Sequence, residues 1–175
     1  DVDKWIIDLR YNQGGNMHPM VSGIAPLIGD GKVGCLKSLE DETLFDWEIK
    51  ASNFIYAGYQ ALNLPDFQIM KAHPKVAILT SRWTVSSGEI VATCFKGRPN
   101  TKFFGEMTGG YTTNNNWEII DSTVILSIST GIFCDRNGNA FEYNIPVDVE
   151  VPFEIGQAPD KDRCVSEALN WLKLD

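Results

Sequence analysis

Two adjacent serines, Ser86 and Ser87, stand where a predicted strand gives way to a predicted helix. Residues 76–79 form an apolar run typical of a buried strand, and apolar residues at 90, 91, 92 and 95 fit one face of a helix. The unpaired N–H groups at a helix start favour negative charge, so a serine there could act as the nucleophile of acyl transfer. The simpler alternative is a helix N-cap, a common position for serine.

A second strand, loop and helix precede this one in the chain. Gly14 and Gly15 follow a predicted strand at residues 5–9 and come before a predicted helix at about 17–28, with Asn16 as a candidate N-cap. Glycine lets backbone N–H groups approach a substrate closely, because no Cβ is in the way. In a parallel sheet both loops would leave the carboxyl ends of their strands, where sites usually form.

The composition excludes several classes of protein. The chain has 175 residues, 43% hydrophobic and 22% charged, as in an ordinary globular domain. A net charge of −8 and the lack of any Lys/Arg cluster argue against nucleic-acid binding. No apolar run is long enough to cross a bilayer and no signal peptide is visible. Four dispersed cysteines and two histidines give no zinc-site spacing, so we expect buried thiols, no metal and no cofactor.

Strands and helices alternate along the chain, which predicts an α/β fold and a single domain spanning residues 1–175. Further strands are expected at 33–36, 44–50, 101–104 and 149–151, a β-hairpin at 117–133 and a closing helix at 162–172. The stretch 54–64 is ambiguous, with helix expected in part of it. The chain begins without methionine at the edge of a predicted buried strand, so we expect a fragment of a longer protein that lacks its N-terminal part.

Four segments, in order, resemble the tail-specific, or C-terminal processing, serine peptidases. They are DLRYNQGG at 8–15, TVSSGE at 84–89, GEMTGG at 105–110 and NIPVDVEV at 144–151. The resemblance implies a crotonase-like α/β core with a mixed, mostly parallel sheet and flanking helices. It also implies Ser86 as the nucleophile, with the glycine loop at Gly14 and Gly15 and the N–H of Ser87 as the oxyanion hole.

One departure indicates the branch of the family. Lysine-dependent members carry their base just after the third motif, where this chain has Tyr111, and tyrosine is a poor substitute for a desolvated lysine. The segment GGNM at 14–17, followed by Pro19 and Met20, is similar to the tricorn-like, nisin-resistance-protein-like branch, which uses a histidine base assisted by a glutamate. That histidine would lie upstream of this chain. Glu142 is the candidate assisting carboxylate, although its motif match is out by about one position.

Three further titratable residues, His18, His73 and Glu89, are expected to have structural rather than catalytic roles. His73 precedes the central strand and is expected at the surface, and His18 is expected as a pocket wall or surface residue. Glu89 is expected to stabilise the first turn of its helix rather than to take part in catalysis.

We therefore expect a serine endopeptidase core that acts on peptides or protein tails, in an exported, periplasmic or cell-envelope protein. Alone, the fragment should be nearly inactive. The alternatives are a peptide-binding module of the same fold that has lost catalysis, and a crotonase relative that handles acyl-CoA.

Overall fold

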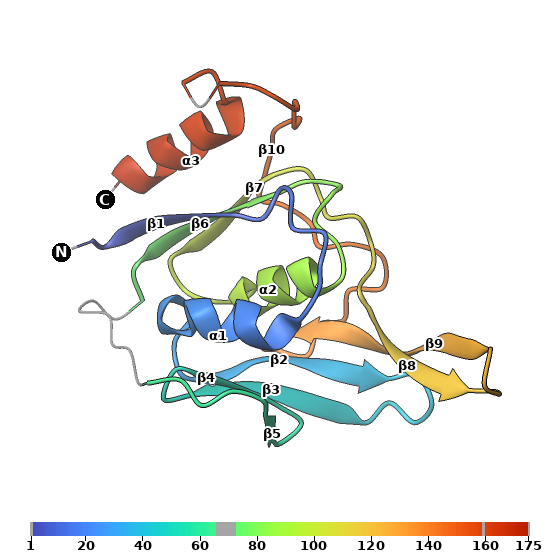
Figure 1. Cartoon of the computed structure of the whole chain (residues 1–175). Coiled ribbons are helices and arrows are strands. Elements are labelled where there is room, and N and C mark those ends of the chain that lie inside the picture. Colours follow the sequence, from blue (N-terminus) through green and yellow to red (C-terminus); the bar gives the residue numbers. More distant parts are fainter. Residues whose placement is uncertain (1, 66–72, 159, 175) are drawn as a thin grey trace.

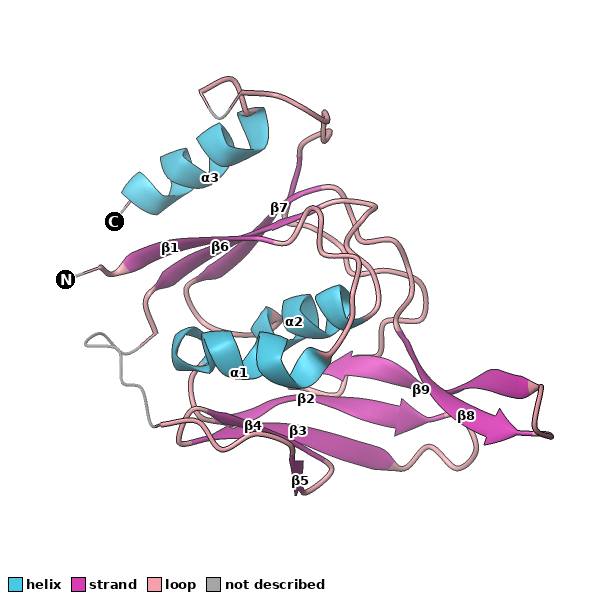
Figure 2. Ribbon diagram, in the orientation of Figure 1, coloured by secondary structure: helices cyan, strands magenta, loops and turns pink. Residues whose placement is uncertain are grey.

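The computed structural model describes residues 2–65, 73–158 and 160–174, and they form four layers (Figures 1 and 2). A four-stranded sheet has the order β1-β6-β7-β10 and all its neighbouring strands are parallel. Its strands are β1 (Lys4–Asp8), β6 (Lys75–Thr80), β7 (Thr101–Gly105) and β10 (Val149–Glu150). The predicted α/β class, with a parallel sheet and flanking helices, is confirmed.

A second sheet of six antiparallel strands has the order β5-β4-β3-β2-β9-β8. Its strands are β2 (Gly31–Ser38), β3 (Leu44–Lys50), β4 (Asn53–Tyr56), β5 (Tyr59–Gln60), β8 (Thr113–Ile119) and β9 (Ile125–Asp135). The helix expected in part of 54–64 was wrong. The described part of this stretch contains β4 and β5, joined by a two-residue turn at 57–58 that pairs Tyr56 with Tyr59.

Helices α1 (Met17–Ile28) and α2 (Ser87–Phe95) lie between the two sheets (Figure 1). Every residue of α2 is buried. The predicted N-cap of α1 is confirmed, because Asn16 Oδ1 accepts a hydrogen bond from His18 N–H at 3.0 Å. A helix buried on all sides holds its first turn rigidly, and that turn carries the two serines.

The central strand β6 contributes to two cores. Val76 and Ile78 pack with α1, α2 and the six-stranded sheet, whereas Ala77 and Leu79 pack with α3 (Arg163–Lys173) on the outer face. Successive side chains of a strand point to opposite faces, so a strand covered on both sides reads as a continuous apolar run. The prediction of a buried strand is confirmed.

The expectation of buried thiols is also confirmed, since all four cysteines are buried and free. No helix among the described residues has the length and apolar character needed to span a membrane.

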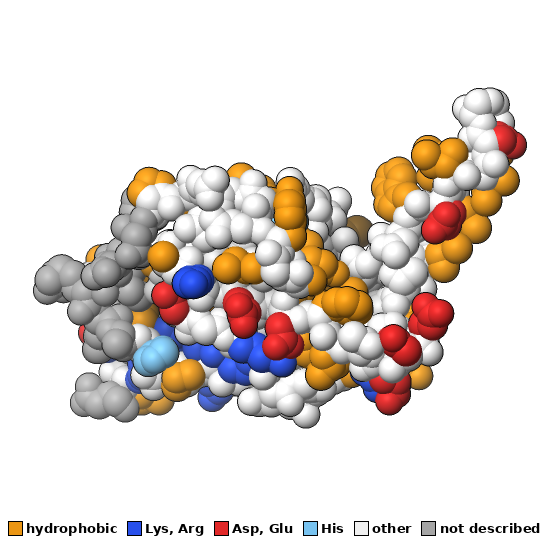
Figure 3. All heavy atoms as spheres, turned by 90° about the horizontal axis from the view of Figure 1, so that it is seen from below, with side chains coloured by type: hydrophobic (Ala, Val, Ile, Leu, Met, Phe, Trp, Pro, Cys, Tyr) orange, Lys and Arg blue, Asp and Glu red, His pale blue; other side chains and the backbone are white. Residues whose placement is uncertain are grey.

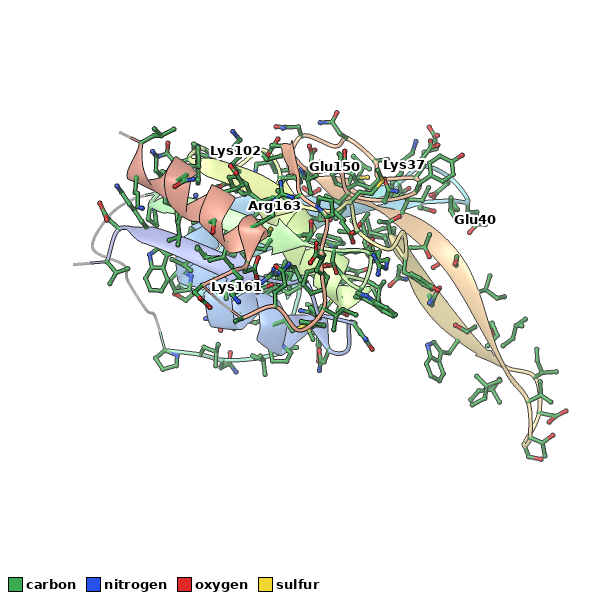
Figure 4. All side chains as sticks on the ribbon, turned by 90° about the horizontal axis from the view of Figure 1, so that it is seen from above. Lys37, Glu40, Lys102, Glu150, Lys161 and Arg163 are labelled. Atoms are coloured by element: carbon green, nitrogen blue, oxygen red, sulfur yellow. The ribbon has the colours of Figure 1, made fainter. Side chains whose placement is uncertain are left out.

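Strands β8 and β9 extend beyond the body of the protein as a two-stranded arm (Figures 3 and 4). Large apolar side chains are exposed along it, because a hairpin that extends from the body buries little of its own surface. A contiguous exposed apolar surface of this kind is unusual in a protein. They are Trp117, Ile119, Ile120, Val124, Ile125, Leu126 and Ile128.

A buried ion pair links the first loop to the last helix. Arg10 is 6% exposed and donates to Asp8 at 2.6 Å and to Asp162 at 2.7 Å. Asp162 is also the N-cap of α3, where its Oδ1 accepts from Val165 N–H at 3.1 Å. Burial by itself would raise the pKa of Asp162, but the bonds from Arg10 and the helix N–H groups outweigh it and lower that pKa.

We expect Asp162→Ala to lower the free energy of unfolding by about 3 kcal/mol at neutral pH, because it removes a cap and leaves the buried Arg10 with one carboxylate fewer. The folded-state pKa of Asp162 lies below its unfolded value, so its stabilisation is present above about pH 4 and is lost as the pH falls. Urea unfolding at neutral and acidic pH measures both effects.

The matched variant is Asp162→Asn, which keeps a capping oxygen but loses the charge and should fall between wild type and the alanine variant. Equal stability of wild type and Asp162→Ala at pH 7 would contradict this account of Arg10.

Candidate active site

The two loops meet because β1 and β6 are parallel neighbours whose carboxyl ends coincide, with Asp8 opposite Leu79. Hydroxyl groups of the second loop donate to backbone carbonyls of the first: Ser81 Oγ to Arg10 O at 2.6 Å, Thr84 Oγ1 to Leu9 O at 2.8 Å and Ser87 Oγ to Gly15 O at 2.7 Å. Val85 N–H also donates to Asn12 O at 3.0 Å. These bonds hold the diglycine loop directly against the double-serine loop.

Ser86 occupies the N-cap position of α2 in an unusual backbone conformation. Its φ of 53° and ψ of −122° are rarely adopted by a residue with a Cβ, and such strain costs about 1–3 kcal/mol. A serine held exposed on a sharp strand-to-helix turn is the arrangement of a nucleophile elbow. Ser86 is exposed, whereas its neighbour Ser87 is 6% exposed and uses its hydroxyl to hold Gly15.

Gly14 and Gly88 permit the close approach of the loops. A Cβ on Gly14, whose φ is +93°, would lie 2.9 Å from Ser86 Cβ, and one on Gly88 would lie 2.5 Å from Asn12 O. Neither distance is compatible with a side chain. The two loops can therefore pack at this distance only with glycine at both positions.

The predicted oxyanion donors differ in their availability. Gly14 N–H donates to Asn12 Oδ1 at 3.0 Å, so it is already engaged. Gly15 is exposed, and Ser87 is the first residue of α2, where a backbone N–H has no acceptor within the helix. Gly15 and Ser87 thus stay the candidate donors of the predicted oxyanion hole, and Gly14 permits the close approach of the two loops.

Glu89 is completely buried behind the serine turn. Its Oε2 accepts from Ser86 N–H at 2.9 Å, and its Oε1 accepts from Thr108 Oγ1 at 2.6 Å and from Gly110 N–H at 3.0 Å. Burial raises the pKa of this carboxyl, and the bonds from Thr108, Gly110 and Ser86 oppose that rise. Glu89 supports the first turn of α2 as expected, and it also ties that turn to the loop at 105–110, a connection that the sequence analysis missed.

Ser86 opens onto a cavity of about 520 Å³ between the two loops and the base of the arm. Its lining includes Gly15, His18, Ser87 and Trp117. A larger hollow of about 610 Å³ lies between β2, β3 and the arm, but neither loop reaches it. We assign the site to the smaller cavity because it contains the strained serine and both remaining donors.

His18 is part of the cavity wall, as expected, with its ring 5.7 Å from Phe54 and 5.9 Å from Tyr59. Burial lowers its pKa, because the charged form is disfavoured there. His73 is exposed and precedes β6, at the end of that strand opposite Ser86. Within the described residues, no three His, Cys, Asp or Glu side chains gather as metal ligands.

Glu142 is exposed on the segment between β9 and β10 and does not line the cavity that contains Ser86. Its neighbour Tyr143 packs its carbonyl closely against Gly110, on the loop that Glu89 binds. The structure therefore places Glu142 next to the supporting loop rather than beside the serine.

The fold and this site define a class. The sequence profile of peptidase family S41 matches residues 1–151, and the chain belongs to that family. It is 32% identical over 169 residues to the nisin-resistance protein of Lactococcus lactis subsp. lactis, covering 96% of this chain and 49% of that protein. The predicted resemblance to the peptidases of this branch is confirmed.

Two solved structures show the same fold. A lipoprotein from Streptococcus agalactiae is 30% identical with a TM-score of 0.74, covering 98% of this chain and 54% of that one. The photosystem II D1 C-terminal processing protease is 16% identical with a TM-score of 0.63, covering 86% of this chain and 35% of that one. The crotonase-like core is thereby confirmed. The chain spans about half the length of the Lactococcus protein and of the Streptococcus lipoprotein.

Proposed function

We propose that the chain is the catalytic core of a serine endopeptidase that cleaves peptides or protein tails through Ser86. One observation carries the proposal: an exposed serine in a strained turn lies directly against the diglycine loop, at a cavity that residues of both loops line. A simple N-cap needs neither the strain nor the cavity. Membership of a peptidase family supports the same reaction class.

In the proposed reaction Ser86 Oγ attacks the scissile carbonyl carbon and gives its proton to a base. The N–H groups of Gly15 and Ser87 hold the resulting oxyanion. Collapse of the tetrahedral intermediate breaks the C–N bond, the base returns the proton to the leaving amine, and an acyl-enzyme remains. Water then attacks the acyl-enzyme by the same route and regenerates the Ser86 hydroxyl.

The base in this proposal is a histidine from sequence outside these 175 residues. Tyr111, at the position of the lysine in other members, is 66% exposed and is not desolvated as a lysine base must be. Glu142 remains the proposed assisting carboxylate. Because the Glu142 side chain is exposed, its carboxylate is free to orient a histidine contributed by a segment outside these 175 residues.

The second candidate function is a peptide-binding module that has lost catalysis. Tyr111 favours it, because the base of the lysine-dependent members is missing. The two functions share the cavity and differ in whether Ser86 is activated.

We also propose that the protein is exported and associated with the cell envelope. The support is that the similar Streptococcus structure is named a lipoprotein and that the similar Lactococcus protein is named a nisin-resistance protein.

The test is treatment of the full-length protein with a fluorophosphonate, followed by peptide mapping with mass spectrometry. The proposal expects one covalent adduct on Ser86 and none on the neighbouring Ser87, whose hydroxyl is bound to Gly15. An adduct on another residue would remove Ser86 from the mechanism. An unlabelled protein that still binds peptides would establish the binding module instead.

A further inference from the structure

The arm carries a free sheet edge that leads out of the Ser86 cavity. β8 pairs with β9 along one edge, and no strand of the described residues pairs with the other. Such an edge presents backbone N–H and C=O groups that can bind another extended chain. Proteins usually protect these edges, and among the described residues this one stays uncovered.

The register identifies the residues whose backbone faces outward. Ile120 N–H donates to Val124 O at the end of the hairpin, so this pair is hydrogen-bonded. Hydrogen-bonded and non-hydrogen-bonded pairs alternate along an antiparallel ladder. Counting back from Ile120, the backbone groups of Ile119, Trp117 and Asn115 point away from β9 to the free edge.

Two of the three residues whose backbone groups point to the free edge also line the cavity. Asn115 and Trp117 both belong to the lining of the hollow that contains Ser86. The Trp117 side chain is 72% exposed, and the neighbouring pair Ile119 and Ile125 continues the apolar surface outward along the arm. Figures 3 and 4 show this arm extending away from the body. An extended chain with its reactive carbonyl at Ser86 can therefore continue along β8 past Asn115 and reach the apolar surface of Trp117 and Ile119.

We propose that the peptide substrate binds as an added strand on the free edge of β8 and that Trp117 selects an apolar side chain several residues from the scissile bond. This proposal rests on the proposed function, because it takes the occupant of the Ser86 cavity to be a substrate. The preferred substrate is an unstructured segment with apolar residues at alternate positions, as in β-strand addition generally. Continuity between the edge and the cavity favours this occupant over a second copy of the chain.

The test measures binding without hydrolysis, so it does not depend on catalysis. Full-length Ser86→Ala protein is mixed with a soluble synthetic peptide that has leucine at alternate positions, and amide hydrogen exchange is followed by mass spectrometry. We expect slower exchange in the segment 113–120 when the peptide is present. A peptide with serine in place of each leucine should bind about tenfold more weakly.

Two matched comparisons locate the contacts. Trp117→Ala should weaken binding of the leucine peptide about thirtyfold, whereas Ile128→Ala, on the opposite face of the arm, should leave it unchanged. Asn115→Pro removes an outward N–H but spares the ladder to β9 and should bind about tenfold more weakly than Asn115→Ala, which reports the side chain alone.

Peptide binding with no protection of 113–120, or equal loss in the Trp117 and Ile128 variants, would overturn the inference. Protection that depends on protein concentration and needs no peptide would also overturn it and would identify a second copy as the occupant. Failure of Ser86 labelling is a separate result, which would refute the proposed catalysis and leave the binding measurement valid.

Discussion

Ser86→Gly should abolish peptide hydrolysis and at the same time make the protein more stable. Loss of the attacking hydroxyl should lower kcat/KM by about 10⁴-fold or more. The φ of 53° is strained for serine and unstrained for glycine, so the free energy of unfolding should rise by about 1 kcal/mol. Peptide hydrolysis and urea unfolding of the full-length protein measure the two effects.

Ser86→Ala is the matched control, because it also lacks the hydroxyl but keeps the Cβ that causes the strain. It should be as inactive as the glycine variant and less stable than it. A glycine variant no more stable than the alanine variant would show that the turn stores no strain. Retained hydrolysis in both would show that another residue is the nucleophile.

Glu89→Gln should be strongly destabilising although it preserves the size of the side chain. The groups that face the carboxylate are all donors, namely Ser86 N–H, Thr108 Oγ1–H and Gly110 N–H. A glutamine would direct its NH₂ group at a donor inside a fully buried site, which costs about 1–3 kcal/mol for each unsatisfied group. We expect a loss of about 3 kcal/mol in the free energy of unfolding.

The same variant should slow the reaction of Ser86 with a fluorophosphonate by at least tenfold, because the Ser86 backbone would lose the acceptor that fixes it. Glu106→Gln is the control: Glu106 lies in the same loop, but its carboxylate is partly exposed and binds Arg82 at 3.3 Å and Phe153 N–H at 3.2 Å rather than Ser86. That variant should cost less stability than Glu89→Gln and should leave the labelling rate of Ser86 unchanged. Equal behaviour of the two variants would deny Glu89 a positioning role.

The positions of both loops followed from local patterns in the sequence. An apolar run ending in polar residues and glycine, followed by a helical period, predicts a strand, a loop and a helix, and parallel pairing then brings Gly15 and Ser87 together. The role of Ser86 could be proposed because four motifs occur in order. Its positive φ gave no signal, since serine is common in unstrained turns.

Other features depend on contacts between distant segments and could not be predicted. Glu89 was assigned to its helix, but its bond to Gly110 depends on how the loop at 105–110 folds back. The split into two sheets was missed because alternation within a strand does not reveal which other strand it pairs with. The separation of Glu142 from the cavity followed from the path of an irregular segment, for which no periodic pattern exists.

The hydroxyl bonds across the loop junction have a consequence for redesign. The hydroxyl groups of Ser81, Thr84 and Ser87 all donate hydrogen bonds to main-chain carbonyls, which every amino acid possesses. Substitution of an exposed side chain on the first loop, such as that of Gln13, therefore leaves these three hydrogen bonds intact. The first loop can therefore vary in its exposed side chains, while the three hydroxyls that bind its backbone have to stay as they are.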